Sequence, residues 1–143
     1  MTSSTLAEQL GGDKALSRSV RSDLELADAI RLGISYRAVE HVIDTGMLEA
    51  NEVYELVGSR RSLARKKKEG RALSAIESDR LARVARVIGR AEDALGGRDT
   101  AHRWLRKPNR ALGGRRPLEL LTSDIGARMV EQVLGRIEHG VYS

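Results

Sequence analysis

Six of the ten residues from 59 to 68 are arginine or lysine, and two more are serine. An arginine guanidinium can donate two parallel hydrogen bonds to O6 and N7 of guanine, whereas a lysine ammonium pairs with phosphate as a point charge. Arg60, Arg61 and Ser62 stand at the end that would reach base edges, and the cations after them suit phosphates better. We therefore predict these DNA-binding residues: Ser59, Arg60, Arg61, Ser62, Arg65, Lys66, Lys67 and Lys68.

The net charge of +5 is concentrated in two short basic segments. Residues 58–71 and residues 98–116 each hold seven basic groups and one acidic group, whereas residues 1–57 hold five and ten. Concentrated positive charge is typical of proteins that bind polyanions, because each phosphate neutralised releases condensed counterions. A solvated helix face is the alternative for the first segment, and the second segment could contact DNA, a protein or solvent.

Two short helices separated by a glycine would position the first basic segment. Apolar residues three and four apart predict a helix over 50–57, after which Gly58 supplies a left-handed turn. Ser59 is placed to cap a second helix, Arg60–Glu69, whose one large apolar residue is Leu63. This is helix-turn-helix spacing, in which the second helix lies in the major groove.

Catalytic and metal-binding chemistry has no candidate residues in this sequence. The chain has no cysteine, and its histidines (His41, His102 and His139) lie far apart and match no metal-ligand spacing. The Gly-Gly pairs lack the context of a phosphate-binding loop, so no cofactor is expected. Glu131 and Glu138 lie seven residues apart and could form an acid–base pair, although exposed helical glutamates are usually solvated. We predict that the chain is not an enzyme and has no small-molecule substrate of its own.

Capping residues and apolar spacing predict helices along most of the remaining chain, and no segment alternates with period two. An all-α fold follows: a helix-turn-helix bundle and a smaller C-terminal group of helices. The further predicted elements are a helix over 23–32 capped by Ser22, one capped by Ser35, a long one opened by Ser74 and Glu77 and ended by Gly96, a short one capped by Asp99, a turn started by Pro117, and a final helix capped by Ser123.

Two core predictions concern the C-terminal helices. The aromatic residues make up 3% of the chain and are too scattered to stack RNA bases, so RNA is disfavoured as a partner and Trp104 is expected in the core. The apolar stripe of the final helix is expected to comprise Ile125, Met129, Val133 and Ile137.

The predicted domain organisation has three parts. Residues 1–20 form a flexible N-terminal arm, 21–97 a DNA-binding and dimerisation domain, and 98–143 a C-terminal domain. No apolar run approaches the ~18 residues of a membrane span, and the polar first residues lack the regions of a signal peptide. A cytoplasmic protein without a membrane partner is therefore expected.

The C-terminal third carries a spaced set of tryptophan, proline, glycine and aliphatic residues: Trp104-Leu105, Pro108-Asn109, Leu112-Gly113, Pro117-Leu118-x-Leu120-Leu121, Gly126, Val130, Leu134, Ile137, Gly140, Tyr142 and Ser143. This set resembles the toxin-binding domain of Xre-MbcA-ParS antitoxins. The N-terminal half, through Val53-Tyr54-x-Leu56-Val57-Gly58-Ser59-x-x-Ser62-Leu63-x-Arg65, looks like the Xre-like helix-turn-helix of those antitoxins. Together the two parts cover about residues 25–143.

The resemblance implies a RES-domain toxin as partner, which in this family degrades NAD. The family's antitoxins block the toxin's active site with the C-terminal helix and tail, are usually homodimers, and repress their own operon through palindromic operator DNA. The toxin-binding positions that this implies are Ile137, Glu138, Gly140, Val141, Tyr142 and Ser143. Tyr142 would be a rigid anchor for a pocket, the alternative being a frayed chain end.

Two other functions compete with this interpretation. A free-standing helix-turn-helix transcriptional regulator would have no toxin partner, and its C-terminal helices would serve dimerisation alone. A small all-α enzyme or nucleic-acid processing factor is disfavoured by the missing nucleophile, metal ligands and phosphate loop.

Overall fold

The computed structural model describes residues 3–16 and 18–140. Within those ranges the regular elements are helices, together with one isolated β-bridge between Asn109 and Arg115. The predicted all-α fold is confirmed. The chain divides into two compact units, here called the N-terminal unit (Met1–Ala85) and the C-terminal unit (Arg86–Ser143). The division falls inside a long helix, earlier in the chain than the domain boundary expected after residue 97.

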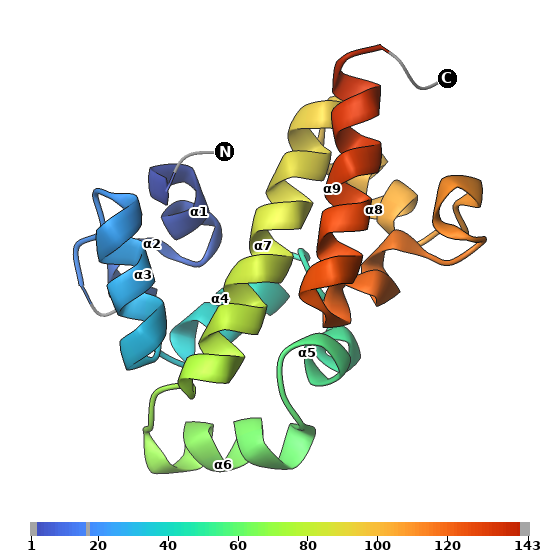
Figure 1. Ribbon diagram of the computed structural model, residues 1–143. Coiled ribbons are helices and arrows are strands. Elements are labelled where there is room, and N and C mark those ends of the chain that lie inside the picture. The colour runs from blue at the N-terminus through green and yellow to red at the C-terminus, as the bar shows by residue number, and fades with distance from the viewer. Residues whose placement is uncertain (1–2, 17, 141–143) are drawn as a thin grey trace. The chain divides into compact units, whose positions relative to one another are not determined.

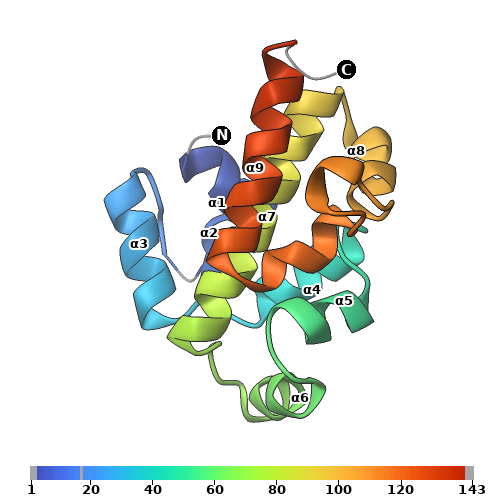
Figure 2. The same ribbon diagram turned by 45° about the vertical axis from the view of Figure 1, so that its right-hand side comes forward.

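The N-terminal unit is built mainly from short helices (Figures 1 and 2), and their buried side chains form an apolar core. Side chains buried completely in this core include Ile34, Val39, Val42 and Leu81. Its helices are α1 (Ser3–Gln9), α2 (Gly12–Leu16), α3 (Asp23–Leu32), α4 (Arg37–Asp44), α5 (Ala50–Leu56), α6 (Arg60–Glu69) and the first part of α7 (Ala75–Leu95).

The first helices, α1 and α2, occupy a stretch for which we expected no regular structure. Leu6, Leu10 and Leu16 are all buried there, and α2 contacts α4 while α1 contacts α3. Helices this short are not stable alone in water, so their stability comes from tertiary packing. A weak pattern of three leucines therefore contributes to the core, although it lacks the capping signals that mark the other helices.

Most of the predicted helix caps are confirmed, and two are wrong. Each confirmed serine Oγ accepts a hydrogen bond from the backbone N–H three residues later. Helix α4 has Tyr36 at its N-cap position, one residue later than expected, and Ser35 Oγ accepts a hydrogen bond from the N–H of Arg37, the first residue of the helix. The short helix before Pro108 is capped by Gly97, which places Asp99 inside its first turn. The confirmed capping residues are Ser22, Ser59, Ser74 and Ser123.

The C-terminal unit comprises the second part of α7 and the helices that follow it. Pro117 occupies the start of a 3-10 helix, as predicted. Trp104 is half-buried, so the core there is formed mainly by Leu105, Leu121 and Leu134. No helix in the described part of the chain has the length and apolarity to cross a membrane. The elements of this unit are α8 (Arg98–Leu105), η1 (Arg110–Leu112), η2 (Pro117–Thr122) and α9 (Asp124–Glu138).

The buried face of α9 differs from the stripe expected from the sequence. Ile125 is 73% exposed and Met129 is 41% exposed, whereas Val133 is buried as predicted. The helix instead buries a face rich in small residues, because only small side chains allow η2 to approach so closely. The buried residues of α9 are Gly126, Ala127, Val130, Val133 and Leu134.

Gly126 is the point of closest approach between α9 and η2. A Cβ atom at this position would overlap the carbonyl oxygen of Leu120, which is backbone and cannot move aside. We expect Gly126→Ala to lower the free energy of unfolding by about 1–3 kcal/mol, as overpacked positions do. Urea denaturation followed by circular dichroism measures the change.

Gly135→Ala is the matched control in the same helix. There the added Cβ would meet only the end of the flexible Arg90 side chain, so we expect a gain of up to about 1 kcal/mol from helix propensity. Equal unfolding midpoints for the two variants would show that Gly126 is not a packing requirement.

Candidate nucleic-acid interface

The basic helix α6 is held in the N-terminal unit by its ends and by one apolar anchor. Ser59 Oγ accepts a hydrogen bond from the N–H of Ser62 at 3.1 Å, which caps the helix. Gly70 ends it in the left-handed conformation, with φ of 64°. Leu63 is completely buried, as predicted from its isolation among charged residues. The helix is therefore fixed along one side and free along the other.

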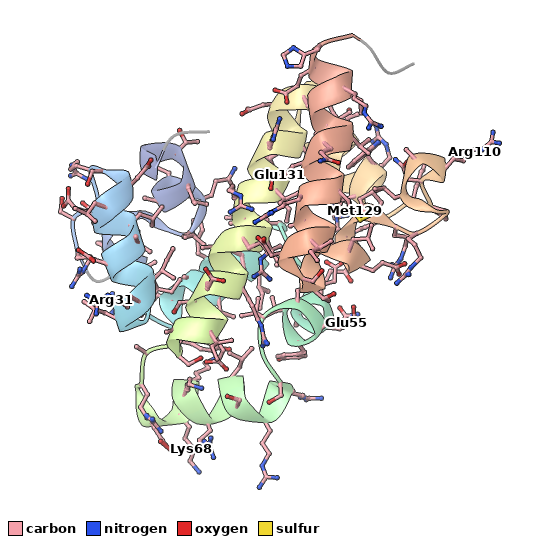
Figure 3. The ribbon with its side chains drawn as sticks, in the orientation of Figure 1. Arg31, Glu55, Lys68, Arg110, Met129 and Glu131 are labelled. Carbon is pink, nitrogen blue, oxygen red and sulfur yellow. The ribbon has the colours of Figure 1, made fainter. Side chains whose placement is uncertain are left out.

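The predicted DNA-binding residues of α6 fall into two groups. Arg60, Arg61, Arg65, Lys67 and Lys68 are exposed, whereas the Ser62 side chain is half-buried and the Lys66 side chain is only 12% exposed. Figure 3 shows Lys68 pointing away from the helices of the N-terminal unit. The structure thus places five cations outward and the side chains of Ser62 and Lys66 inward.

The outward cations differ in whether they already have partners. Lys67 Nζ lies 3.8 Å from a carboxylate oxygen of Glu40 and 5.8 Å from the centre of the Tyr36 ring. No ion pair to Arg60, Arg61, Arg65 or Lys68 occurs in the described part of the chain. Arg61, Arg65 and Lys68 follow one another at four and three residues, so they share one helix face.

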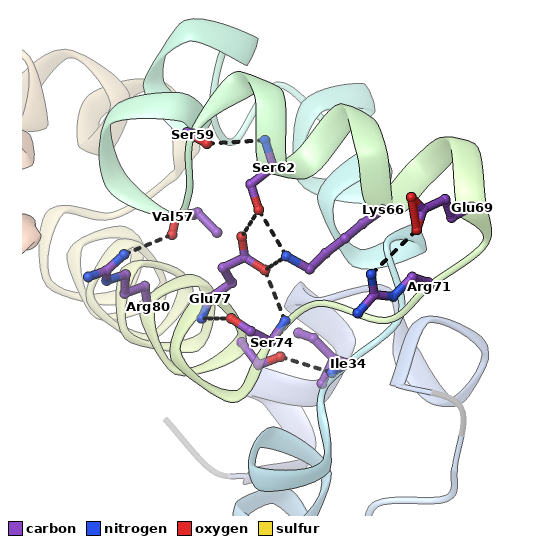
Figure 4. Close-up of polar contacts among 11 residues, drawn as sticks. Ile34, Val57, Ser59, Ser62, Lys66, Glu69, Arg71, Ser74, Glu77 and Arg80 are labelled. Carbon is purple, nitrogen blue, oxygen red and sulfur yellow. Dashed lines mark hydrogen bonds and ion pairs between the residues drawn. The ribbon is translucent and has the colours of Figure 1, made fainter.

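Lys66 and Ser62 contact a buried carboxylate at the start of α7. Lys66 Nζ lies 2.8 Å from Glu77 Oε1, and Ser62 donates to Glu77 Oε2 at 3.0 Å (Figure 4). Lys66 also donates to Ser62 Oγ at 2.9 Å, and the N–H of Ser74 donates to Glu77 Oε1 at 2.9 Å. Glu77 is 6% exposed, and no buried side-chain polar atom among the described residues lacks a partner. We call Glu77, Lys66, Ser62 and Ser74 the Glu77 network.

The Glu77 network keeps its carboxylate ionised although it is buried. Burial alone raises the pKa of Glu77, but the hydrogen bonds from Lys66, Ser74 and Ser62 and the charge of Lys66 together outweigh it. The pKa of Glu77 is therefore lower than its ordinary value of 4.5. The charged carboxylate of Glu77 thus links α7 to α6 through the side chains of Ser62 and Lys66.

Gly58 has a different role from the one expected from the sequence. We predicted a left-handed turn, but Gly58 is not among the glycines with positive φ. A Cβ atom at this position would lie 2.7 Å from Oε2 of Glu77. Glycine at position 58 therefore makes room for the buried carboxylate, and the prediction of a left-handed turn was wrong.

The C-terminal positions predicted to bind a toxin lie at the end of α9. Ile137 is half-buried, and Gly140 ends the helix with φ of 69°. Glu138 Oε1 accepts a hydrogen bond from Arg90 Nε at 3.2 Å. The other predicted positions, Val141, Tyr142 and Ser143, lie outside the described residues.

Glu131 and Glu138 belong to an ionic network between α7 and α9 of the C-terminal unit. Glu131 pairs with Arg86 at 3.0 Å and with Arg90 at 3.5 Å, and Arg90 also pairs with Glu138. Both carboxylates are therefore engaged in ion pairs with arginines of α7. Within the described residues, no group of acidic or histidine side chains is arranged to hold a metal ion.

The second basic segment forms α8 and the loop that carries η1. Arg115 Nε lies 2.6 Å from Glu119 Oε1, and Arg116 lies 3.5 Å from the same carboxylate. The hydrogen bond from Arg115, with the nearby charges of Arg115 and Arg116, lowers the pKa of Glu119. Arg110 is exposed and points outward from this loop in Figure 3. Part of this positive charge is therefore neutralised within the unit.

Comparison with known proteins gives two family matches and several relatives. The model of the antitoxin Xre-like helix-turn-helix domain matches residues 25–86, and that of the antitoxin Xre/MbcA/ParS C-terminal toxin-binding domain matches residues 90–140. A protein named antitoxin Xre from Yersinia enterocolitica is 34% identical over 120 residues, covering 82% of this chain and 81% of that protein. One of the same name from Photorhabdus laumondii is 32% identical, covering 78% and 76%. A protein named Prs ADP-ribosylating antitoxin from Sphingobium is 26% identical, covering 91% and 87%.

Proposed function

Because this chain belongs to the Xre/MbcA/ParS family of antitoxins, we propose that it binds operator DNA through α6 and neutralises a cognate toxin through its C-terminal unit. The observation that carries the first part is the division of α6 into two sides. One side is fixed by Leu63 and the Glu77 network, and the other presents arginines without partners among the described residues.

In the proposed DNA complex, α6 lies in the major groove. Arg60 and Arg61, in the first turn, face base edges, while Arg65 and Lys68 contact phosphates further along the helix. Ser62 and Lys66 support the reading side, because their polar groups already bind Glu77. A homodimer on a palindromic operator would repeat these contacts in two half-sites and repress the antitoxin's own operon in the cytoplasm.

The proposed toxin is a RES-domain protein that degrades NAD. The C-terminal helix and the residues after it would block its active site, with Ile137, Glu138, Gly140, Val141, Tyr142 and Ser143 in contact. The match to a toxin-binding domain over residues 90–140 supports this placement. The antitoxin itself would not turn over NAD.

Removing Val141, Tyr142 and Ser143 tests the proposed toxin contact. We expect the shortened chain to bind the toxin about thirtyfold more weakly, because a buried aromatic anchor contributes about 2 kcal/mol or more to an interface. Co-expression with the adjacent reading frame, followed by growth and cellular NAD measurements, gives the result. DNA binding should be unchanged, since α6 is intact.

The reciprocal control is a chain with Arg61→Ala and Arg65→Ala, which should lose DNA affinity and still rescue growth. Full growth rescue by the shortened chain would show that Val141, Tyr142 and Ser143 do not contribute to toxin binding. The name of the Sphingobium relative refers to ADP-ribosylation, so the same cells are also assayed for ADP-ribosylated protein. ADP-ribosylated protein without depletion of NAD would indicate that the toxin is an ADP-ribosyltransferase instead of a RES-domain protein.

The alternative of a free-standing regulator makes a different prediction for the same cells. Such a protein would bind the DNA upstream of its own gene and would not co-purify with the product of the adjacent reading frame. Isolation of a stable complex with that product excludes this alternative.

A further inference from the structure

A cavity of about 600 Å³ in the N-terminal unit is lined mainly by polar and charged side chains. This volume lies in the range of small-ligand sites, ~300–1,000 Å³. The lining comes from α2, the start of α4, the end of α6 and the loop after α6. Glu40 is the acidic residue of the lining, and its cationic residues are Lys14, Arg37, Lys66, Lys67 and Arg71.

These cations differ in how firmly they are already paired. Lys66 is bound to Glu77 and Ser62, and Arg71 lies 3.4 Å from Glu69 on the surface. Lys14 and Arg37 are exposed, and neither side chain has an ion pair or hydrogen bond to any described residue. When Glu40, Glu69 and Glu77 are all counted against the five cations, two positive charges remain at the cavity.

We propose that this cavity binds a phosphate group, with Lys14 and Arg37 as its main contacts. A guanidinium and an ammonium that line one cavity provide a planar pair of donors and a point charge, both of which bind phosphate oxygens. Lys67 and Arg71 can join them, because the Lys67–Glu40 pair is long at 3.8 Å and the Arg71 side chain is 61% exposed. Exposed pairs of this kind are weak and exchange partners readily.

The phosphate can come from two sources. It is either free in solution or part of a DNA backbone that passes the end of α6, and only the second case rests on the proposed operator binding. The cavity is lined by Lys66 and Lys67 in the last turn of α6 and by its C-cap Gly70, whereas Arg60 and Arg61 are in the first turn. A backbone phosphate there would fix how α6 is oriented along the groove.

The first arm of the test titrates inorganic pyrophosphate into the full chain by isothermal calorimetry. The variant Lys14→Gln/Arg37→Gln removes the two charges without partners at exposed positions, so folding is retained. We expect its affinity to fall at least about tenfold. Arg103→Gln/Lys107→Gln removes the same charge from exposed positions of the C-terminal unit and should leave pyrophosphate binding unchanged.

The second arm measures affinity for the DNA upstream of the gene at several salt concentrations. Each phosphate that the protein no longer neutralises lowers the slope of log affinity against log salt by about 0.9. A pyrophosphate affinity that depends on Lys14 and Arg37 identifies free phosphate as a ligand. A decrease in the salt slope alone identifies a backbone phosphate.

The proposal is overturned if Lys14→Gln/Arg37→Gln has the wild-type affinity for pyrophosphate and the wild-type salt dependence of DNA binding. It is also overturned if the two double variants bind pyrophosphate equally and the salt dependence of their DNA binding is the same. A wild-type chain that binds no DNA would instead contradict the function proposed for α6. In that case the pyrophosphate titration still decides whether the cavity is a phosphate site.

Discussion

Glu77→Gln is expected to lower the free energy of unfolding by about 3 kcal/mol, the size expected when one partner of a buried ion pair is removed. Glutamine retains an oxygen that can accept the N–H of Ser74, so the cap of α7 persists. Lys66, only 12% exposed, is left without its counter-ion. Denaturation in urea at neutral pH measures the loss.

Two further variants separate the ion pair from a general effect of removing an acid. Glu55→Gln removes an exposed carboxylate on α5 and should change stability by less than about 0.5 kcal/mol. Adding Lys66→Met to Glu77→Gln removes both charges and should restore most of the loss, because replacing a whole buried pair by uncharged groups is often neutral. If Glu77→Gln unfolds at the same urea concentration as Glu55→Gln, the network does not stabilise the fold.

The effect of Glu77→Gln should also depend on pH in a defined direction. The pKa of Glu77 is lower in the folded state than its ordinary value of 4.5, so folding favours the ionised carboxylate. Its contribution to stability is complete above pH 4.5 and disappears as the pH falls through the folded pKa. The difference between wild type and variant should be constant near neutral pH and shrink in acid.

Arg61→Ala combined with Arg65→Ala should weaken operator binding about a hundredfold or more. Each guanidinium can make charge-assisted hydrogen bonds worth about 1.5–3 kcal/mol, and no described residue in the free protein offers either one an ion pair. The salt dependence should also fall, by about 0.9 in slope for each phosphate that the variant leaves unneutralised. Fluorescence anisotropy with the DNA upstream of the gene measures both quantities.

A matched pair of substitutions at other arginines controls for net charge. Arg21→Ala with Arg31→Ala removes two positive charges that are paired with Asp13 and Asp28 elsewhere in the N-terminal unit. Its DNA affinity should stay within about threefold of wild type, since long-range charge is largely screened at physiological salt. Equal decreases in affinity for the two double variants would assign the effect to net charge instead of to α6.

Much of the fold could be predicted from the sequence because capping is a local property. Ser22, Ser59, Ser74 and Ser123 each precede a helix that begins where expected. Packing was harder to predict, because it depends on neighbours distant in sequence. Helix α9 carries two overlapping apolar stripes, the predicted one through Ile125 and Met129 and the buried one through Val130 and Leu134. The contact of Gly126 with η2 decides which of them is buried.

The candidate interface was predicted as a segment but not residue by residue. Composition located the basic helix, yet it cannot distinguish an outward lysine from an inward one. Positions 59, 62, 63 and 66 recur at helical spacing around Leu63, which is the signal that could have placed Ser62 and Lys66 on the inner side. Nothing local indicates that Glu77, predicted only as a capping residue, also holds these two side chains.

The division of α6 into an inner and a solvent side defines which positions an engineer could vary to change the proposed operator preference. Gly58, Ser62 and Lys66 must stay together with Glu77, since a change at one leaves a clash or an unpaired charge at another. The solvent side carries none of these constraints. A library restricted to positions 60, 61, 64, 65 and 68 should therefore yield folded variants in which the proposed DNA contacts differ, whereas transplanting the whole helix from a relative would require the matching residues 58 and 77 as well.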